Sequence, residues 1–176
     1  FWVDALYTIL NDAESGAGGG ACAAPCSFGD HHFGGLYASW DAAEWLPEWD
    51  FYALYRFDSV GRPRPHNYVT IGTRMKGKAN GFDYRFEGTG QIGKSTVTGA
   101  NANQRDYQAD LEVGYTWENA YNFRVGLEGL VASRNYIQLF PTAHKWIGYV
   151  DILGRRNVMA GVVHLSIQPN DKWKLN

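Results

Sequence analysis

The stretch FDYRFEGTGQ, residues 82–91, decides the fold of this chain, because its side chains alternate strictly in character. Aromatic residues and glycines fill the even positions, whereas charged and polar residues fill the odd positions. Successive side chains of a β-strand point to opposite faces, so this period of two predicts a strand with one apolar and one wet face. The same pattern recurs in YQADLEVGYTW (107–117) and YNFRVGLEGLV (121–131).

Weaker versions of the alternation predict further strands at residues 1–10, 33–41, 49–57, 68–76 and 157–168, and another begins at residue 172. Most of these segments span about 9–11 residues, the length that crosses a bilayer at a tilt. Short links (AAEWLPE, KANG, ENA and PND) alternate with long ones at 11–32, 58–67, 92–106 and 132–156. Transmembrane barrels show this asymmetry, with tight periplasmic turns and long outer loops.

We therefore predict an all-β, antiparallel, up-and-down transmembrane β-barrel. Tyr and Trp at the ends of the apolar faces, such as Tyr107 and Trp117, are typical of interfacial girdles. The alternative is a soluble carbohydrate-binding β-sandwich, which also buries one face of each strand and would use Trp40, Trp45 and Trp49 to bind sugars. About nine strands cannot close a bacterial barrel, so we expect residues 1–176 to be one partial barrel domain of a longer, even-stranded porin.

Composition narrows the function classes. A net charge of −2 argues against a nucleic-acid partner, and no apolar run is long enough for a transmembrane helix. No signal peptide precedes Phe1, so we expect a mature product or a piece of a longer chain. Cys22 and Cys26 favour a small loop disulfide, with free thiols or half of a metal site as alternatives.

Motifs for catalysis are missing from the sequence. There is no GxSxG, HExxH, phosphate loop or dinucleotide fingerprint. His31 and His32 lie in a Gly-rich stretch, and we interpret them as loop residues. We predict no enzyme activity, no catalytic residue, no cofactor and no metal.

The stretch LFPTAHKWIGYVDILGRRN, residues 139–157, breaks the alternation and carries the most specific sequence signal. Together with the following VMAGVVHLSIQPNDKWKL, it resembles the C-terminal part of the alginate-export family of outer-membrane porins. GFDYRFEGTGQIGK and the strand ending in GYTW resemble that family in the same order, so the resemblance covers about residues 50–176. It implies an integral protein of the bacterial outer membrane, whose barrel exports an anionic uronic-acid polysaccharide through a lumen lined with Arg and Lys.

Strand parity places a set of charged residues on the predicted lumenal face. The cations that could line the substrate path are Arg56, Arg74, Lys76, Arg85, Arg124 and His164. Asp110 and Glu112 share this face with further carboxylates, so the alternative is that the cations pair with them and hold the barrel wall.

The stretch at 139–157 is expected to be an outer loop that folds against or into the barrel. Its residues at the pore mouth are His144, Lys145, Arg155 and Arg156. The leading functional hypothesis is a channel for a polar, preferably anionic, saccharide or small solute. A structural barrel subunit or anchor is the alternative, in which long loops such as 11–32 bind other envelope proteins.

Overall fold

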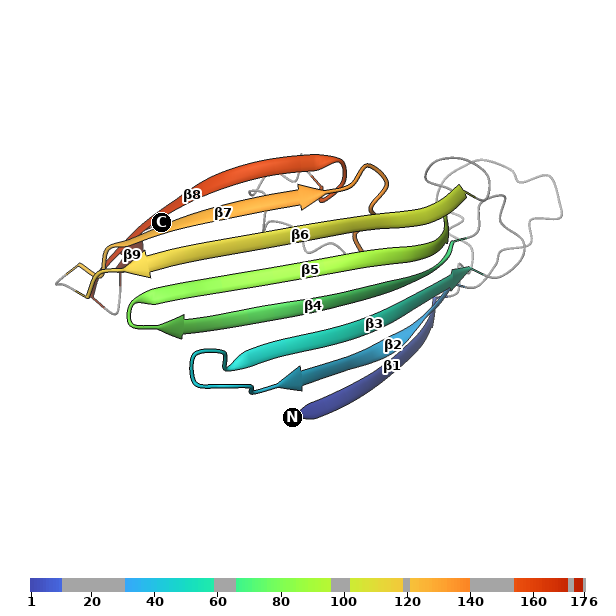
Figure 1. Ribbon diagram of the computed structural model, residues 1–176, viewed down its shortest axis with the longest axis horizontal. Coiled ribbons are helices and arrows are strands. Elements are labelled where there is room, and N and C mark those ends of the chain that lie inside the picture. The colour runs from blue at the N-terminus through green and yellow to red at the C-terminus, as the bar shows by residue number, and fades with distance from the viewer. Residues whose placement is uncertain are drawn as a thin grey trace.

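The computed structural model describes residues 1–10, 31–58, 66–95, 102–118, 121–139, 154–170 and 173–175. Within these ranges the strands are β1 (Trp2–Leu10), β2 (His31–Trp40), β3 (Glu48–Asp58), β4 (Asn67–Ala79), β5 (Phe82–Ser95), β6 (Ala102–Thr116), β7 (Arg124–Ala132), β8 (Val158–Asn170) and β9 (Trp173–Leu175). They form one sheet in the order of the chain, from β1 to β9, and every pairing is antiparallel (Figure 1). The predicted all-β, up-and-down fold is confirmed. No helix in the described ranges is long and apolar enough to cross a membrane.

The central strands are longer than the sequence predicted. β5 has 14 residues and β6 has 15, so the expected link at 92–106 shrinks to residues 96–101. The prediction failed there because Lys94 falls on the apolar side of the alternation, opposite Asn67 of β4. A strand that continues beyond the apolar band needs no apolar side chains, so the pairing continues where the sequence pattern stops.

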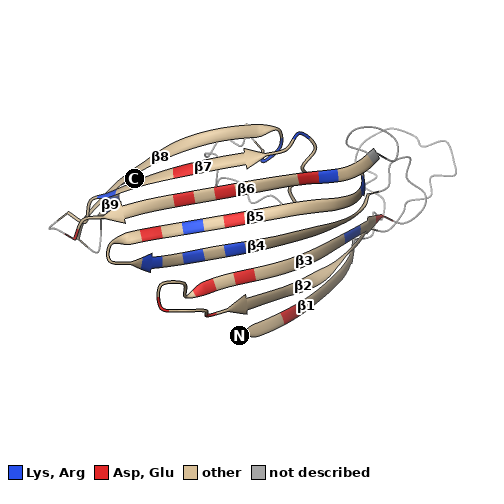
Figure 2. Ribbon diagram, viewed as in Figure 1, with Lys and Arg blue, Asp and Glu red and all other residues tan. Residues whose placement is uncertain are grey.

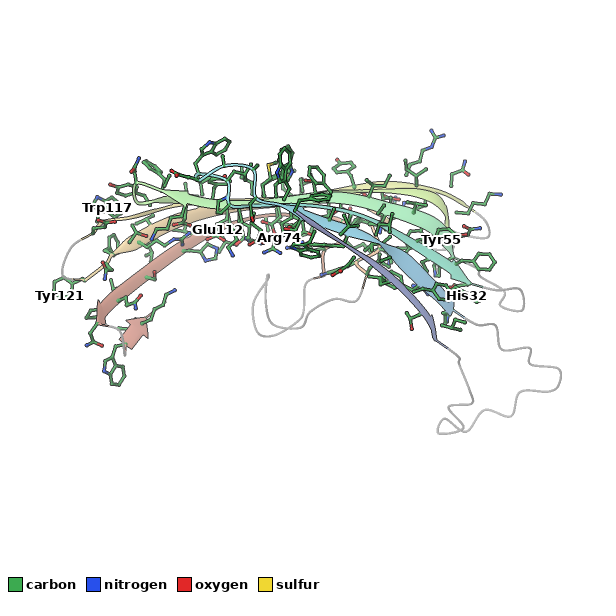
Figure 3. All side chains as sticks on the ribbon, turned by 90° about the horizontal axis from the view of Figure 1, so that it is seen from below. His32, Tyr55, Arg74, Glu112, Trp117 and Tyr121 are labelled. Atoms are coloured by element: carbon green, nitrogen blue, oxygen red, sulfur yellow. The ribbon has the colours of Figure 1, made fainter. Side chains whose placement is uncertain are left out.

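The register separates the sheet into two chemically different faces. Arg74 lies opposite Glu87, and Glu87 lies opposite Asp110, so charged residues of β4, β5 and β6 share one face. Figure 3 shows the sheet as an arch, with Arg74 and Glu112 on its concave side. Large apolar side chains such as Ile71, Leu111 and Leu127 alternate with them and are exposed.

The convex face is therefore an apolar band, and aromatic residues mark its ends. Trp117 and Tyr121 lie at one end of the arch, and Tyr55 lies at the other (Figure 3). A β-sandwich would bury this band under a second sheet, but the described residues form a single sheet. The sheet is open at β1 and β9 within the described ranges. That this domain is part of a larger closed barrel remains a prediction.

The tight turn between β4 and β5 fixes the register of the central hairpin. Asn80 has a φ of 51° and Gly81 a φ of 81°, the pair of left-handed residues that a two-residue hairpin with a type I′ turn requires. The Gly81 carbonyl also accepts a hydrogen bond from the Thr116 N–H at 2.8 Å, which ties the turn to β6. The KANG link of the sequence is therefore a structural element rather than a spacer.

Replacing Gly81 tests this turn. A Cβ at Gly81 would lie 2.8 Å from the Thr116 carbonyl oxygen, and an alanine there would have to adopt the left-handed φ of 81°. Gly81→Ala should therefore lower the free energy of unfolding by roughly 1–2 kcal/mol. Urea unfolding of the intact protein in detergent, followed by tryptophan fluorescence, measures the change. Gly90→Ala is the matched control in β5, because its Cβ would meet nothing within 4 Å. Equal unfolding midpoints for the two variants would contradict the assigned role of the turn.

Candidate functional site

The concave face carries every strand residue that the sequence placed on the substrate path. The register puts Arg56, Arg74, Lys76, Arg85, Arg124, His164, Asp110 and Glu112 on this face. Figure 2 shows acidic and basic positions side by side across β3 to β6. The structure therefore gathers these residues into one surface, and their contacts show what each can do.

Arg85 lies in the centre of a cluster of carboxylates. Its Nη2 atom is 3.3 Å from Asp110 Oδ1, 3.3 Å from Glu112 Oε2 and 3.5 Å from Glu128 Oε1. The side chains of Asp110 and Glu128 are almost fully buried, so their charges depend on this guanidinium. Arg85 of β5 therefore pairs with carboxylates of both β6 and β7.

Arg124 links the start of β7 back to β5. Its Nε donates to Asp83 Oδ2 at 2.8 Å, and its Nη2 donates to Glu112 Oε1 at 2.8 Å. The guanidinium crosses β6 at Gly114, where a Cβ would lie 2.2 Å from Nη2. Because Gly114 has no side chain, it leaves room for Arg124 to cross β6 and reach Asp83.

The cations of β3 and β4 are also paired, but they are more exposed. Arg74 Nη2 is 2.9 Å from Glu48 Oε1, and Lys76 Nζ is 3.5 Å from Glu48 Oε2. Near the other end of β3, Arg56 Nε lies 3.3 Å from Asp58 Oδ1. Arg56, Arg74 and Lys76 therefore each pair with a carboxylate.

Arg155 joins the concave face from outside the strands. Its Nη2 donates to Asp110 Oδ2 at 2.6 Å, and its Nη1 lies 3.5 Å from Glu87 Oε2. Arg155 belongs to the connection between β7 and β8, whose two described ends, residues 133–139 and 154–157, we call the in-folded segment. Asn157 N–H donates to the Ser133 carbonyl at 2.9 Å, so the two ends are held together.

Glutamine side chains hold the in-folded segment on the sheet. Gln91 Oε1 accepts from Ile137 N–H at 2.9 Å, and Gln91 Nε2 donates to the Ile137 carbonyl at 2.7 Å. Gln104 Nε2 donates to the Asn135 carbonyl at 2.8 Å, and Asp106 Oδ1 accepts from the Ser133 hydroxyl at 2.7 Å. Gln91 and Gln104 are buried.

This role of Gln91 and Gln104 was not predicted from the sequence. The available signal was the presence of long amides at inward positions of β5 and β6, where a wet lumen does not require them. Only the tertiary contacts showed that they replace backbone pairing for a non-strand segment.

Three potential metal ligands meet on the same face. The donor atoms of Glu112, Glu128 and His164 lie within 4.8 Å of one another. His164 Nε2 is 2.7 Å from Glu128 Oε2, and Glu112 is contacted by both Arg85 and Arg124. The guanidinium groups already supply positive charge to these carboxylates, so the donor set fits an ion-pair network better than a cation site.

Several predicted site residues lie outside the described residues or at their edge. Cys22, Cys26, His144 and Lys145 fall outside the described ranges. Arg156 is described, and its Nε donates to the Arg134 carbonyl at 3.1 Å. It therefore supports the in-folded segment rather than the sheet.

Removal of Arg155 tests how the in-folded segment is held. Arg155→Ala leaves the buried Asp110 with one guanidinium fewer, and breaking a buried ion pair costs about 3–5 kcal/mol. Amide hydrogens of residues 133–139, including that of Ile137, should then exchange at least about a hundredfold faster. Mass spectrometry of the intact protein in detergent measures this. Arg134→Ala is the control, because its side chain is exposed. Unchanged exchange in Arg155→Ala would show that Arg155 does not anchor the segment.

Comparison with known proteins shows which family this chain belongs to. The family model described as alginate export matches residues 27–176, which is most of the chain and begins before the region that carried the sequence resemblance. Neither a curated protein nor a solved structure matched the chain. With its single antiparallel sheet, polar concave face and apolar convex face, the chain belongs to the alginate export family.

Proposed function

We propose that this chain forms part of the wall of a channel in the bacterial outer membrane, through which a polar saccharide passes. The observation that carries the proposal is the combination of a charged concave face with an exposed apolar convex face on strands long enough to span a bilayer. Membership of an export family supports transport rather than catalysis. Alginate, the anionic polymer after which the family is named, is the first cargo to test.

The charge balance limits how the wall can act on an anion. On the concave face of β3 to β7, the carboxylates are Glu48, Asp50, Asp58, Asp83, Glu87, Asp106, Asp110, Glu112 and Glu128, and the Arg and Lys residues are Arg56, Arg74, Lys76, Lys78, Arg85 and Arg124. Carboxylates outnumber cations, so this part of the wall is not an uninterrupted electropositive ladder. Its cations serve first to compensate the carboxylates.

Exposure then separates the cations that a solute can contact from those that hold the wall. The Lys76 side chain is 56% exposed, whereas that of Arg85 is 13% exposed. Lys76 and its neighbour Arg74 are therefore the residues of this wall that we propose to contact a passing anion. Arg85 and Arg124 are proposed to act indirectly, by keeping the carboxylates of β5 to β7 compensated.

Charge reversal at Lys76 tests this assignment. The interaction energy of two unit charges 4 Å apart in water is about 1 kcal/mol. Lys76→Glu should therefore shift the ratio of anion to cation permeability severalfold toward cations. The reversal potential of the intact protein in a planar bilayer under a KCl gradient measures the shift. Glu48 keeps its ion pair with Arg74 in this variant, so the wall should stay folded.

Arg105→Glu is the matched control for this experiment. Arg105 is exposed, and its register with Ile92 places it on the convex side. The same charge change there should leave the reversal potential unaltered. Equal shifts in both variants, or no shift in Lys76→Glu, would show that Lys76 does not face the conducting path.

A structural barrel is the second candidate function, and the in-folded segment is the observation that favours it. Residues 133–139 and 154–157 form hydrogen bonds with β5 and β6 and so occupy part of the concave face. A barrel sealed in this way would act as an anchor and bind other envelope proteins through its long loops. Absence of conductance in the intact protein would favour this candidate over the channel.

A further inference from the structure

A pocket of about 270 Å³ lies where the in-folded segment meets the concave face of β2 to β5. Its volume is just below the range of about 300–1,000 Å³ that is usual for ligand pockets, which suits a single sugar ring. Tyr37 and Tyr52 line it from the sheet, and Tyr136, Gln138 and Arg155 line it from the in-folded segment. The roles assigned above to Arg155 and the glutamines do not account for this space.

Tyr52 lies along the sheet instead of standing upright on it. Its register partner on β4 is Gly72, where a Cβ would lie 2.3 Å from Tyr52 Cζ. The hydroxyl reaches across β4 to β5, where it donates to Glu87 Oε1 at 2.9 Å and lies 2.9 Å from Thr89 Oγ1. The ring therefore covers Gly72, and Tyr52 also lines the pocket.

Two further aromatic rings extend this surface toward the edge of the sheet. Tyr37 is parallel to Tyr52 within 3°, with ring centroids 6.0 Å apart, and its hydroxyl donates to Asp50 Oδ2 at 2.6 Å. Trp2 continues the row, with its ring 5.5 Å from Tyr37. Carboxylates thus fix the hydroxyls of Tyr37 and Tyr52. Both tyrosines line the pocket and offer it aromatic surface of the kind that stacks on the C–H face of a pyranose.

Polar groups surround this aromatic surface. Glu87 accepts hydrogen bonds, Gln138 carries both an amide donor and an acceptor, and Thr70 carries a hydroxyl. Tyr136 is buried at the wall of the pocket, and burial raises the pKa of its phenol to about 12, so this group stays neutral and able to donate. The aromatic rings can contact the C–H face of a sugar, and the donors and acceptors beside them can bind its hydroxyls.

The charges at the pocket select between sugar classes. Arg155 lies 3.5 Å from Glu87, but it is closer to Asp110, at 2.6 Å. Asp110 also lies 3.3 Å from Arg85, so the charges at the pocket belong to a larger ion-pair network. This network has three guanidinium groups and five carboxylates and is net negative; its members are Arg85, Arg124, Arg155, Asp83, Glu87, Asp110, Glu112 and Glu128. A uronate carboxylate would be repelled here, whereas an uncharged sugar would not.

We propose that the pocket between Tyr37, Tyr52 and the in-folded segment is a binding subsite for an uncharged hexopyranose unit of an oligosaccharide. The inference rests on the proposed function in one respect, because it takes the concave face to be the water-filled lumen. It goes beyond that function by naming a place where the ring, not a carboxylate, is recognised.

Isothermal titration of the intact protein in detergent tests the subsite directly. The probes are neutral tetrasaccharides of glucose and of mannose, and a tetramer of mannuronate as the acidic comparison. A neutral tetrasaccharide should bind, and Tyr52→Ala should weaken its binding by at least about tenfold, because the variant loses both the buried area of the ring and its aromatic contact. A tenfold change corresponds to about 1.4 kcal/mol. Gly72→Ala should also weaken binding, because its Cβ displaces the Tyr52 ring.

Two variants separate recognition from folding. Tyr52→Phe keeps the ring over Gly72 and should retain most of the affinity. Tyr55→Ala is the matched control on β3, because Tyr55 lies on the convex side of the same strand and contacts Asn67 there. Tyr55→Ala should bind the neutral tetrasaccharide as well as the unaltered protein does.

The outcomes distinguish this proposal from the proposed function. Failure of both neutral tetrasaccharides to bind, equal affinity in Tyr52→Ala, or tighter binding of the mannuronate tetramer would overturn the subsite. Planar-bilayer recordings of the same preparations test the channel separately. If the protein conducts but binds neither neutral tetrasaccharide, only the subsite is overturned. If it does not conduct but binds a neutral tetrasaccharide, only the channel is overturned.

Discussion

The unbroken antiparallel register from β1 to β8 is the constraint on which the rest of this structure depends. Each strand pairs with the next residue by residue, so paired side chains always point to the same face. A slip of one residue would move Arg85 and Asp110 to the convex side and Phe86 and Leu111 to the concave side. The Asn80–Gly81 turn and the ion pairs that cross strands both oppose such a slip.

Charge compensation is the second level of organisation. Asp110 is almost fully buried, yet it lies between two guanidinium groups, one from β5 and one from the in-folded segment. The same carboxylate therefore stabilises the wall and docks a segment that is not a strand. This shared use explains why a wall that looks like an anion path in sequence is largely self-neutralised in the folded protein.

Much of the fold was accessible from the sequence because strand alternation is a local property. The period of two in residues 82–91 and 107–117 predicted both the strands and the faces of their charged residues, and the register confirmed the faces. The ends of β5 and β6 were wrong because the alternation loses its apolar half where the strands leave the apolar band. The roles of Gln91, Gln104 and Gly72 were missed because each depends on a partner that is distant in sequence.

The sequence by itself determined the family, the all-β class and the sorting of residues between a wet and an apolar face, since these depend on motif and on neighbour-to-neighbour alternation. Only the tertiary structure decided which cations are compensated, how the in-folded segment docks, and that Tyr37 and Tyr52 line a pocket beneath it. The physical reason is that hydrogen bonds and ion pairs join residues far apart in the chain, such as Gln91 and Ile137, which are 46 positions apart. No local pattern encodes that distance, whereas the register and the curvature of the sheet bring the two residues together.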